Sequence, residues 1–163
     1  MGRLLVPLFL FSKGFLSSPS FYISAFLESH RDQYYEKLLS VSRDGDWTGW
    51  CGFFLNTVIS QAEDNERKAK KTLKLYREKK HWIMEKTRSQ YAVRALDWFF
   101  NRPIFRTSDF VQTSDIPRPT ANRIVAIAKE GGLLRELRPG RGRRAAVLAF
   151  PELLNIAEGE AVF

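Results

Sequence analysis

From Arg88 onward the chain breaks into short elements in quick succession, and this spacing limits its fold more than any other feature. The apolar pattern predicts a first helix over about 89–101, with Ser89 as its cap. A second helix is expected over 107–112 and a third over about 118–130, which a Gly-Gly pair stops. Two strands, 133–138 and 144–150, then form a hairpin around a Gly-rich loop.

The order helix, helix, turn, helix and hairpin is that of a winged helix-turn-helix module, whose recognition helix lies in the major groove of DNA. One face of the third helix is expected to pack and another to face the groove. The packing face holds Ala121, Ile124, Ile127 and Ala128. The groove face holds Arg118, Asn122, Val125 and Lys129.

Arginine and asparagine have the planar geometry that reaches guanine and adenine edges, and base contacts lie near the start of a recognition helix. The candidates for base edges or nearby phosphates are Arg118, Thr120, Asn122 and Arg123, with Lys129 farther along the helix. The hairpin loop RPGRGRR adds Arg138, Arg141, Arg143 and Arg144, and its glycines let these side chains approach a backbone closely.

The positive charge of the chain gathers in the same region. Residues 117–144 hold eight Lys or Arg against two Glu, a net charge of +6 out of +8 for the whole chain. Such clustering is the electrostatic footprint of phosphate contact, so DNA is the predicted partner. Two alternatives stay open, because a fold does not fix a function: a solvated basic loop on a structural domain, and a module that docks an acidic protein.

The first half of the chain has longer helical patterns. The run 4–11 is apolar nearly all round, which is typical of a helix buried in a bundle, and Gly14 with the Ser17–Pro19 cluster ends it. An amphipathic stretch follows over 21–42. From Trp47 the apolar spacing indicates one long helix or two in tandem, of which the mostly polar part 63–86 is interpreted as a spacer.

These patterns predict a mainly α protein with a small α+β module at its end. The expected domains are a bundle of helices over 1–65, a linking helix over 66–87, and the winged helix-turn-helix over 88–163. Pro117 stands at the start of the recognition helix, where a capping Ser would be usual, so this helix lacks a side-chain acceptor there.

Cysteine and histidine are too few for a disulfide or a zinc site, since the chain has only Cys51, His30 and His81. The chain is therefore expected to be cytoplasmic and without a structural metal. The apolar start is similar to a signal peptide, but Pro7 interrupts it and no cleavage site follows cleanly. The run is also much shorter than the roughly 20 residues of a membrane-spanning helix, so no membrane association is expected.

Two stretches resemble the Fic family, whose members commonly transfer AMP from ATP to protein hydroxyls. The first, GRLLVPLFLFSKGFLSSPSFYISAFLESHRDQYYEKLLSVSRDGDWTGWCGFFL, is similar to the helices that follow the family's catalytic loop, with its Tyr-Tyr pair at Tyr34 and Tyr35. The second, SDFVQTSDIPRPTANRIVAIAKEGGLLREL, is similar to the winged helix that ends many bacterial members. The resemblance implies a partial Fic-type bundle joined to a winged helix.

The catalytic motif of that family, HPFxDGNGRxxR, supplies a general base, an acidic metal ligand and an anion nest for ATP phosphates. The chain has none of this loop; Arg3 alone matches the final Arg of the motif, with Met1 two residues before it. The inhibitory helix pattern of the family is absent too. The chain alone is thus expected to be catalytically incomplete and to need no cofactor, whereas the complete family uses ATP and Mg²⁺.

The resemblance suggests two origins, a fragment of a longer Fic-type protein and a free-standing remnant kept for its winged helix. If the apolar run 4–11 is left uncovered, it is expected to pack on the missing Fic segment or to drive self-association. Two other functions stay open. The chain could contribute to AMP transfer when a separate polypeptide carries the catalytic loop, or it could be a module for protein interactions.

Overall fold

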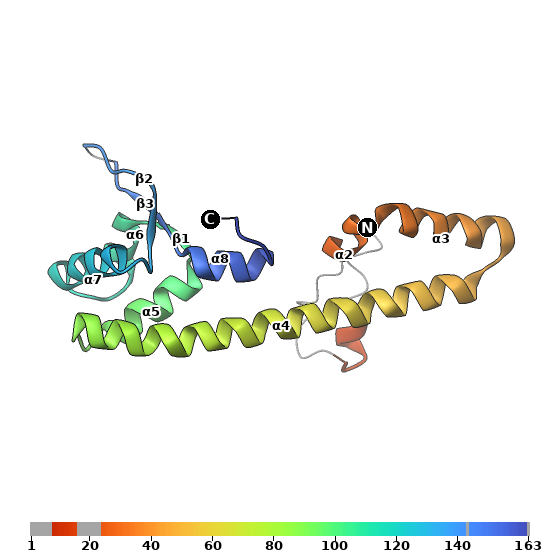
Figure 1. Cartoon of the computed structure of the whole chain (residues 1–163), viewed down its shortest axis with the longest axis horizontal. Helices are drawn as coiled ribbons and strands as arrows, with labels where there is room; N and C mark the ends of the chain where they lie inside the picture. The colour runs from red at the N-terminus through yellow and green to blue at the C-terminus, as the bar shows by residue number, and fades with distance from the viewer. Residues whose placement is uncertain (1–7, 16–23, 143, 163) are drawn as a thin grey trace. The chain divides into compact units, whose positions relative to one another are not determined.

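The computed structural model describes residues 8–15, 24–142 and 144–162 (Figure 1). The chain divides into two compact units, Met1–Arg67 and Lys68–Phe163. Helices dominate both units, and one small antiparallel sheet lies in the second. The expectation of a mainly α fold with a small α+β part is confirmed.

In the first unit, residues 8–12 are helical, and the remainder of the apolar run expected over 4–11 lies outside the described residues. So do Arg3 and the Ser17–Pro19 cluster. The single amphipathic stretch expected over 21–42 is two helices, α2 (Ser24–Ser29) and α3 (Arg31–Asp44). Gly45 ends α3 in a left-handed conformation (φ 71°), which a glycine adopts without steric cost.

The long helix expected from Trp47 is a single one, α4 (Trp47–Thr87), which neither proline nor a left-handed residue interrupts. Near its start, the Gly49 N–H donates to the Asp46 carboxylate (2.8 Å). The part of α4 from Lys68 belongs to the second unit, where Leu75 and Ile83 are buried in the core. The stretch 66–87 is therefore more than a spacer between two domains.

After α4, the described part of the second unit has three helices and one strand, then a hairpin of two strands and a last helix. In chain order these elements are α5 (Ala92–Asn101), β1 (Ile104–Arg106), α6 (Thr107–Thr113), α7 (Arg118–Glu130), β2 (Arg135–Arg138), β3 (Val147–Ala149) and α8 (Pro151–Glu158). The strand order is β1-β3-β2 with antiparallel pairing throughout. This is the connectivity expected of a winged helix-turn-helix, with β1 added to the edge of the hairpin.

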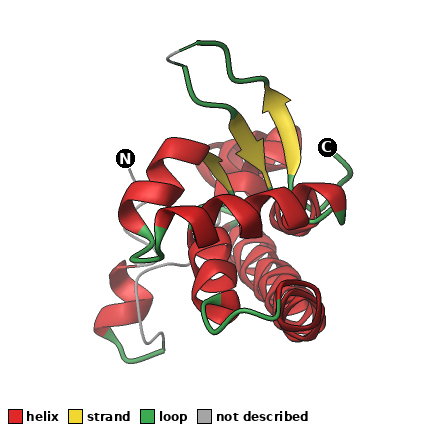
Figure 2. Cartoon of the chain, turned by 90° about the vertical axis from the view of Figure 1, so that its left-hand side faces the viewer, coloured by secondary structure: helices red, strands yellow, loops and turns green. Residues whose placement is uncertain are grey.

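Aromatic rings form the centre of the core of this unit. Phe99 packs against Phe110 with ring centroids 4.9 Å apart and stacks on Phe105 at 5.4 Å. The Trp98 ring meets Phe105 and Phe110 edge-on at 4.8 and 5.1 Å. Burial of such large apolar rings is the main source of stability for a domain of this size. The hairpin rises on one side of this core, while α4 runs along the opposite side (Figures 1 and 2).

Candidate nucleic-acid interface

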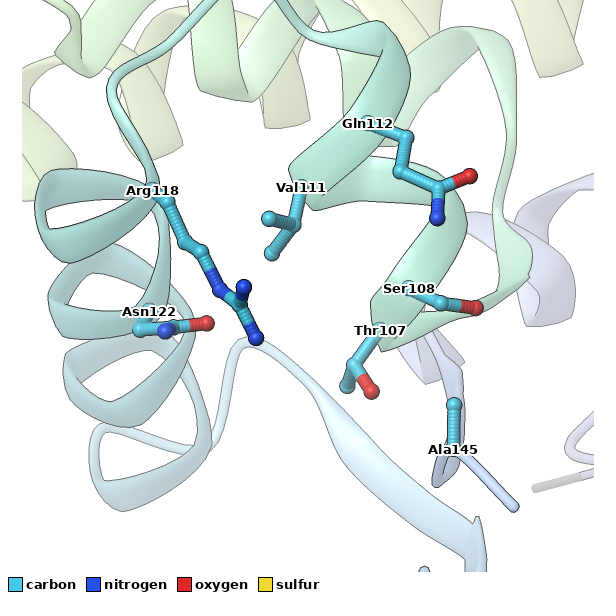
Figure 3. A pocket seen from close by; sticks show the side chains of 7 residues that line it. All are labelled: Thr107, Ser108, Val111, Gln112, Arg118, Asn122 and Ala145. Carbon is cyan, nitrogen blue, oxygen red and sulfur yellow. The ribbon is translucent and has the colours of Figure 1, made fainter. Parts of the chain in front are cut away.

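An open hollow of about 490 Å³ lies between α6, α7 and the base of the hairpin (Figure 3). The Arg118 side chain extends from the start of α7 into this hollow, and Asn122, one turn later, lies beside it. Across from them are the hydroxyl groups of Thr107 and Ser108 at the start of α6. The remaining lining residues are Val111, Gln112 and Ala145. The hollow is thus lined mainly by hydrogen-bonding groups and one guanidinium.

The packing of α7 explains why these side chains face outward. Its buried residues are Ala121, Ile124, Val125 and Ala128, which recur at steps of three and four. Arg118, Asn122 and Arg123 are exposed, and Thr120 is half-buried.

The placement of Val125 on the groove face was wrong, because its side chain is only 8% exposed. Val125 follows Ala121 by four residues and precedes Ala128 by three, so it lies on the packed stripe. Ile127, which was expected to pack fully, is half-buried at the edge of that stripe.

The predicted lack of a side-chain cap on α7 is confirmed. Pro117 occupies the N-cap position and makes no side-chain hydrogen bond, and a second proline, Pro119, stands in the first turn. The Ala121 N–H donates to the Pro117 carbonyl (2.9 Å), so the helix is continuous from its start. The N-cap side chain therefore does not compete with a ligand for the positive end of the helix dipole.

Two strand arginines extend the surface from the hollow onto the sheet. Arg106 of β1 and Arg138 of β2 are both in register with Val147 of β3, so their side chains stand on the same face of the sheet. With Ser108, Arg144 and Ala145 they line a second hollow, of about 420 Å³. Three guanidinium groups thus border one concave surface.

The hairpin tip is held by its backbone. Arg141 and Arg144 exchange two backbone hydrogen bonds of 3.0 Å, and Gly142 between them has a φ of 56°. The strands are shorter than the expected 133–138 and 144–150, since β2 begins at Arg135 and β3 at Val147. Arg138, Arg141 and Arg144 are all exposed, whereas Arg143 lies outside the described residues.

Lys129 differs from the other predicted contact residues. It lies in the last turn of α7 and forms an ion pair with Glu136 of β2. By contrast, no ion pair within the described ranges involves Arg106, Arg118, Arg123, Arg138, Arg141 or Arg144. Lys129 is already neutralised, while these six arginines keep their charge for a ligand.

The structure therefore divides the predicted residues into groups. It brings Arg118 and Asn122 into the first hollow, and Arg138 and Arg144 into the second. Thr120 and Arg123 lie on α7 outside both hollows.

Sequence reasoning missed four polar residues that line these hollows: Arg106, Thr107, Ser108 and Gln112. The signal for Arg106 was its position between a buried Phe105 and the first residue of α6, a place where a strand side chain points to the outer face. The residues of α6 could have been predicted from helix-turn-helix geometry, because the helix before a recognition helix crosses the DNA backbone in proteins of this type.

Other kinds of site find no support in the described part of the chain. It contains no group of three His, Cys, Asp or Glu side chains that could hold a metal ion. None of its helices combines the length and the apolar character needed to cross a bilayer. No protein-family model matches the chain.

Proposed function

We propose that the second unit binds duplex DNA, with the start of α7 in the major groove and the arginines of the sheet and hairpin on the flanking backbone. The observation that carries this proposal is the convergence of Arg118 and Asn122 on one open hollow beside an arginine-lined surface. Arg118 has the donors to recognise guanine, and Asn122 has the donor and acceptor to recognise adenine. Arg106, Arg138 and Arg144 would hold phosphates and set the register of the duplex.

The test is the salt dependence of binding to a fluorescent duplex of random sequence. Neutralising Z phosphates gives a log-log slope of about −0.9Z, so the variant Arg138→Gln/Arg141→Gln/Arg144→Gln should flatten the slope by up to about 2.7. The matched control is Lys13→Gln/Arg31→Gln/Arg43→Gln, which removes the same charge from exposed positions of the first unit. Wild-type protein without measurable duplex affinity at low salt would exclude the proposal.

Base readout needs a separate measurement. Selection of bound duplexes from a random pool should give a preferred site, and Asn122→Ala should relax the preference at one position of it. The expected cost for the preferred duplex is about 1–3 kcal/mol, with little change for a random duplex. Equal weakening on both duplexes would assign Asn122 a phosphate contact instead.

The exposed apolar surface of the first unit supports a second proposal, which concerns the larger assembly in which this unit acts. Phe9 is 60% exposed and Phe15 is 76% exposed, and Tyr35 and Leu39 of α3 are exposed as well. Such a surface calls for cover by another segment. The resemblance to the Fic family suggests that this cover is the catalytic segment of an AMP transferase, in the cytoplasm, with ATP and Mg²⁺ bound there.

Labelled ATP tests this second proposal. The chain alone, with Mg²⁺ and candidate acceptor proteins, should transfer no label. Addition of a Fic-type polypeptide that carries the catalytic loop should restore transfer, and Phe9→Asp should weaken that restoration. Robust labelling by the chain alone would contradict the proposal.

A further inference from the structure

A second concentration of positive charge lies in α4, away from the candidate interface. From Lys68 to His81 the chain has seven Lys or Arg and one Glu, a net charge of +6. The segment 117–144 reaches the same excess in twice the length. The C-terminal half of α4 is therefore a second strongly basic part of this unit, besides the hairpin tip.

The structure sorts these residues onto two sides of the helix. Leu75, Tyr76 and Ile83 face the core, and on the same side Lys79 donates to the Glu152 carboxylate of α8 (2.6 Å). The outward side holds Lys70, Lys74, Arg77 and His81 at steps of four, three and four residues, with Lys71 beside them. We call these five exposed residues the α4 basic face.

Few carboxylates oppose this face. Glu78 lies on it and is 3.9 Å from Lys74, but both side chains are largely exposed, so the pair is weak. The acids of the packed elements nearest to α4 are engaged on the inward side: Asp97 of α5 accepts from Tyr76, and Glu152 accepts from Lys79. Lys70 also has a partner, whereas Lys71 and Arg77 form no ion pair among the described residues. The α4 basic face therefore offers Lys71, Arg77 and the weakly paired Lys74 to a ligand.

The position of this face separates it from the candidate interface. The hairpin rises on one side of the core and α4 lies on the other (Figures 1 and 2). A duplex seated on α7 and the hairpin is therefore on the far side of the unit from Lys70, Lys74 and Arg77. A ligand of the α4 basic face is therefore either a second molecule or a distant segment of the duplex that lies on α7 and the hairpin.

The chemistry of the face indicates its ligand. The row from Lys70 to His81 is about 16 Å long at 1.5 Å per residue, and a duplex carries one negative charge for about every 1.7 Å of its axis. Lysine predominates, and the face has no amide for base edges and only one ring, the imidazole of His81 at its end, so it fits phosphates without reading sequence. The side of the helix that carries Leu75 and Ile83 is buried in the core, so it is not available for insertion into a membrane surface.

We propose that the α4 basic face binds the phosphate backbone of a second duplex segment, so that one chain bridges two segments of DNA. This inference rests on the proposed function, which supplies the first duplex. The recognition side selects a site, and the α4 side holds any neighbouring duplex.

A bridging assay tests the inference. Protein is bound to a biotinylated duplex on beads, and retention of a fluorescent second duplex of unrelated sequence is measured at low salt. Wild-type protein should retain it, and Lys71→Gln/Lys74→Gln/Arg77→Gln should reduce retention to that of beads without protein while still binding the first duplex. The charge-matched control Lys13→Gln/Arg31→Gln/Arg43→Gln should retain it as wild type does.

The outcomes separate the two proposals. If no variant or wild-type protein binds the first duplex, the proposed function fails and bridging fails with it. If the first duplex binds but the triple variant in α4 retains the second duplex as wild type does, the bridging inference alone is overturned, since another surface or a second copy then holds it. The inference would also be overturned if the bead-bound protein retained labelled polyglutamate in place of the second duplex. The partner of the α4 basic face would then be an acidic protein.

Cross-linking gives a second measurement that does not depend on affinity. In a Cys51→Ser background, a photoactivated cross-linker on Lys74→Cys should label the second duplex, and the same reagent on Arg43→Cys should not. Equal labelling from both positions would overturn the inference. Circular dichroism of each variant verifies that α4 remains helical.

Discussion

Trp82 of α4 packs directly against the backbone of Gly131, the residue that ends α7. A β-carbon on Gly131 would lie 2.1 Å from Cζ2 of Trp82 and 2.6 Å from Cη2. The φ of Gly131 is −83°, which any residue adopts, so close approach and not backbone conformation requires glycine there. The indole thereby fixes the C-terminal end of α7 against α4.

Gly131→Ala should force Trp82 out of this contact and lower the free energy of unfolding by about 1–3 kcal/mol. Urea unfolding followed by tryptophan fluorescence measures the change. The control is Gly52→Ala in α4, where an added β-carbon meets nothing within 4 Å and helix propensity improves by up to about 1 kcal/mol. A neutral Gly131→Ala would show that the indole moves freely.

Phe110→Ala should remove a fully buried ring from the centre of the aromatic core. The expected loss is about 3–5 kcal/mol, because the cavity lies among Trp98, Phe99 and Phe105 and cannot collapse easily. Thermal and urea unfolding give the value. Phe9→Ala, at an exposed ring, should change stability by less than about 0.5 kcal/mol.

Glu136→Gln should tighten DNA binding, because it frees Lys129 from its ion pair. The salt slope should steepen by up to about 0.9, the contribution of one additional phosphate contact. Lys129→Gln should change the slope less than Arg138→Gln does, since only Lys129 is already paired. If Lys129→Gln and the arginine variant changed the salt slope equally, the ion pair between Lys129 and Glu136 would have to open on DNA binding.

Tyr76 should ionise at higher pH than an ordinary tyrosine. Its hydroxyl donates to Asp97 (2.6 Å), and this hydrogen bond, then burial, then the charge of Asp97 raise its pKa above the usual value of about 10. The proton is held more tightly in the folded state, so the stabilisation is complete below pH 10 and is lost as pH rises through the folded pKa.

Absorbance titration at the phenolate band and unfolding at a series of alkaline pH values measure both effects. Tyr76→Phe should remove the late-titrating group and this part of the alkaline loss of stability. Asp97→Asn should bring the Tyr76 titration back toward its ordinary range. An unchanged titration in Asp97→Asn would rule out the carboxylate as the cause.

The sequence was most informative where turn-forming residues mark the ends of elements. The bounds of α7 were predicted from Pro117 and the Gly131-Gly132 pair, and the end of α5 at Asn101 was predicted as well. The start of α5 was placed wrongly, because its N-cap is Tyr91 and not Ser89. The strand β1 was missed because three residues are too few for an alternating pattern, and only Phe105 among them is buried. The helix α8 was missed because its eight residues follow the hairpin without a polar cap, starting at Pro151.

The candidate site was predicted in part for a similar reason. Residue type identified Arg118, Asn122 and the hairpin arginines, since those side chains suit bases and phosphates whatever their surroundings. The ion pair of Lys129 and the register that places Arg106 beside Arg138 are tertiary relationships between distant residues, which no local pattern encodes. Val125 was misplaced because an outward and an inward face meet at its position.

The burial of Leu75 and Ile83 among the residues of the winged helix has a practical consequence for dissecting the chain. A fragment cut at the apparent start of the module, near Arg88, would remove Leu75 and Ile83 from the buried cluster and Lys79 from its ion pair with Glu152. A portion that keeps this core whole begins at Lys68 and extends through α8. If this module is transplanted into another protein, the last twenty residues of α4 must be included with it.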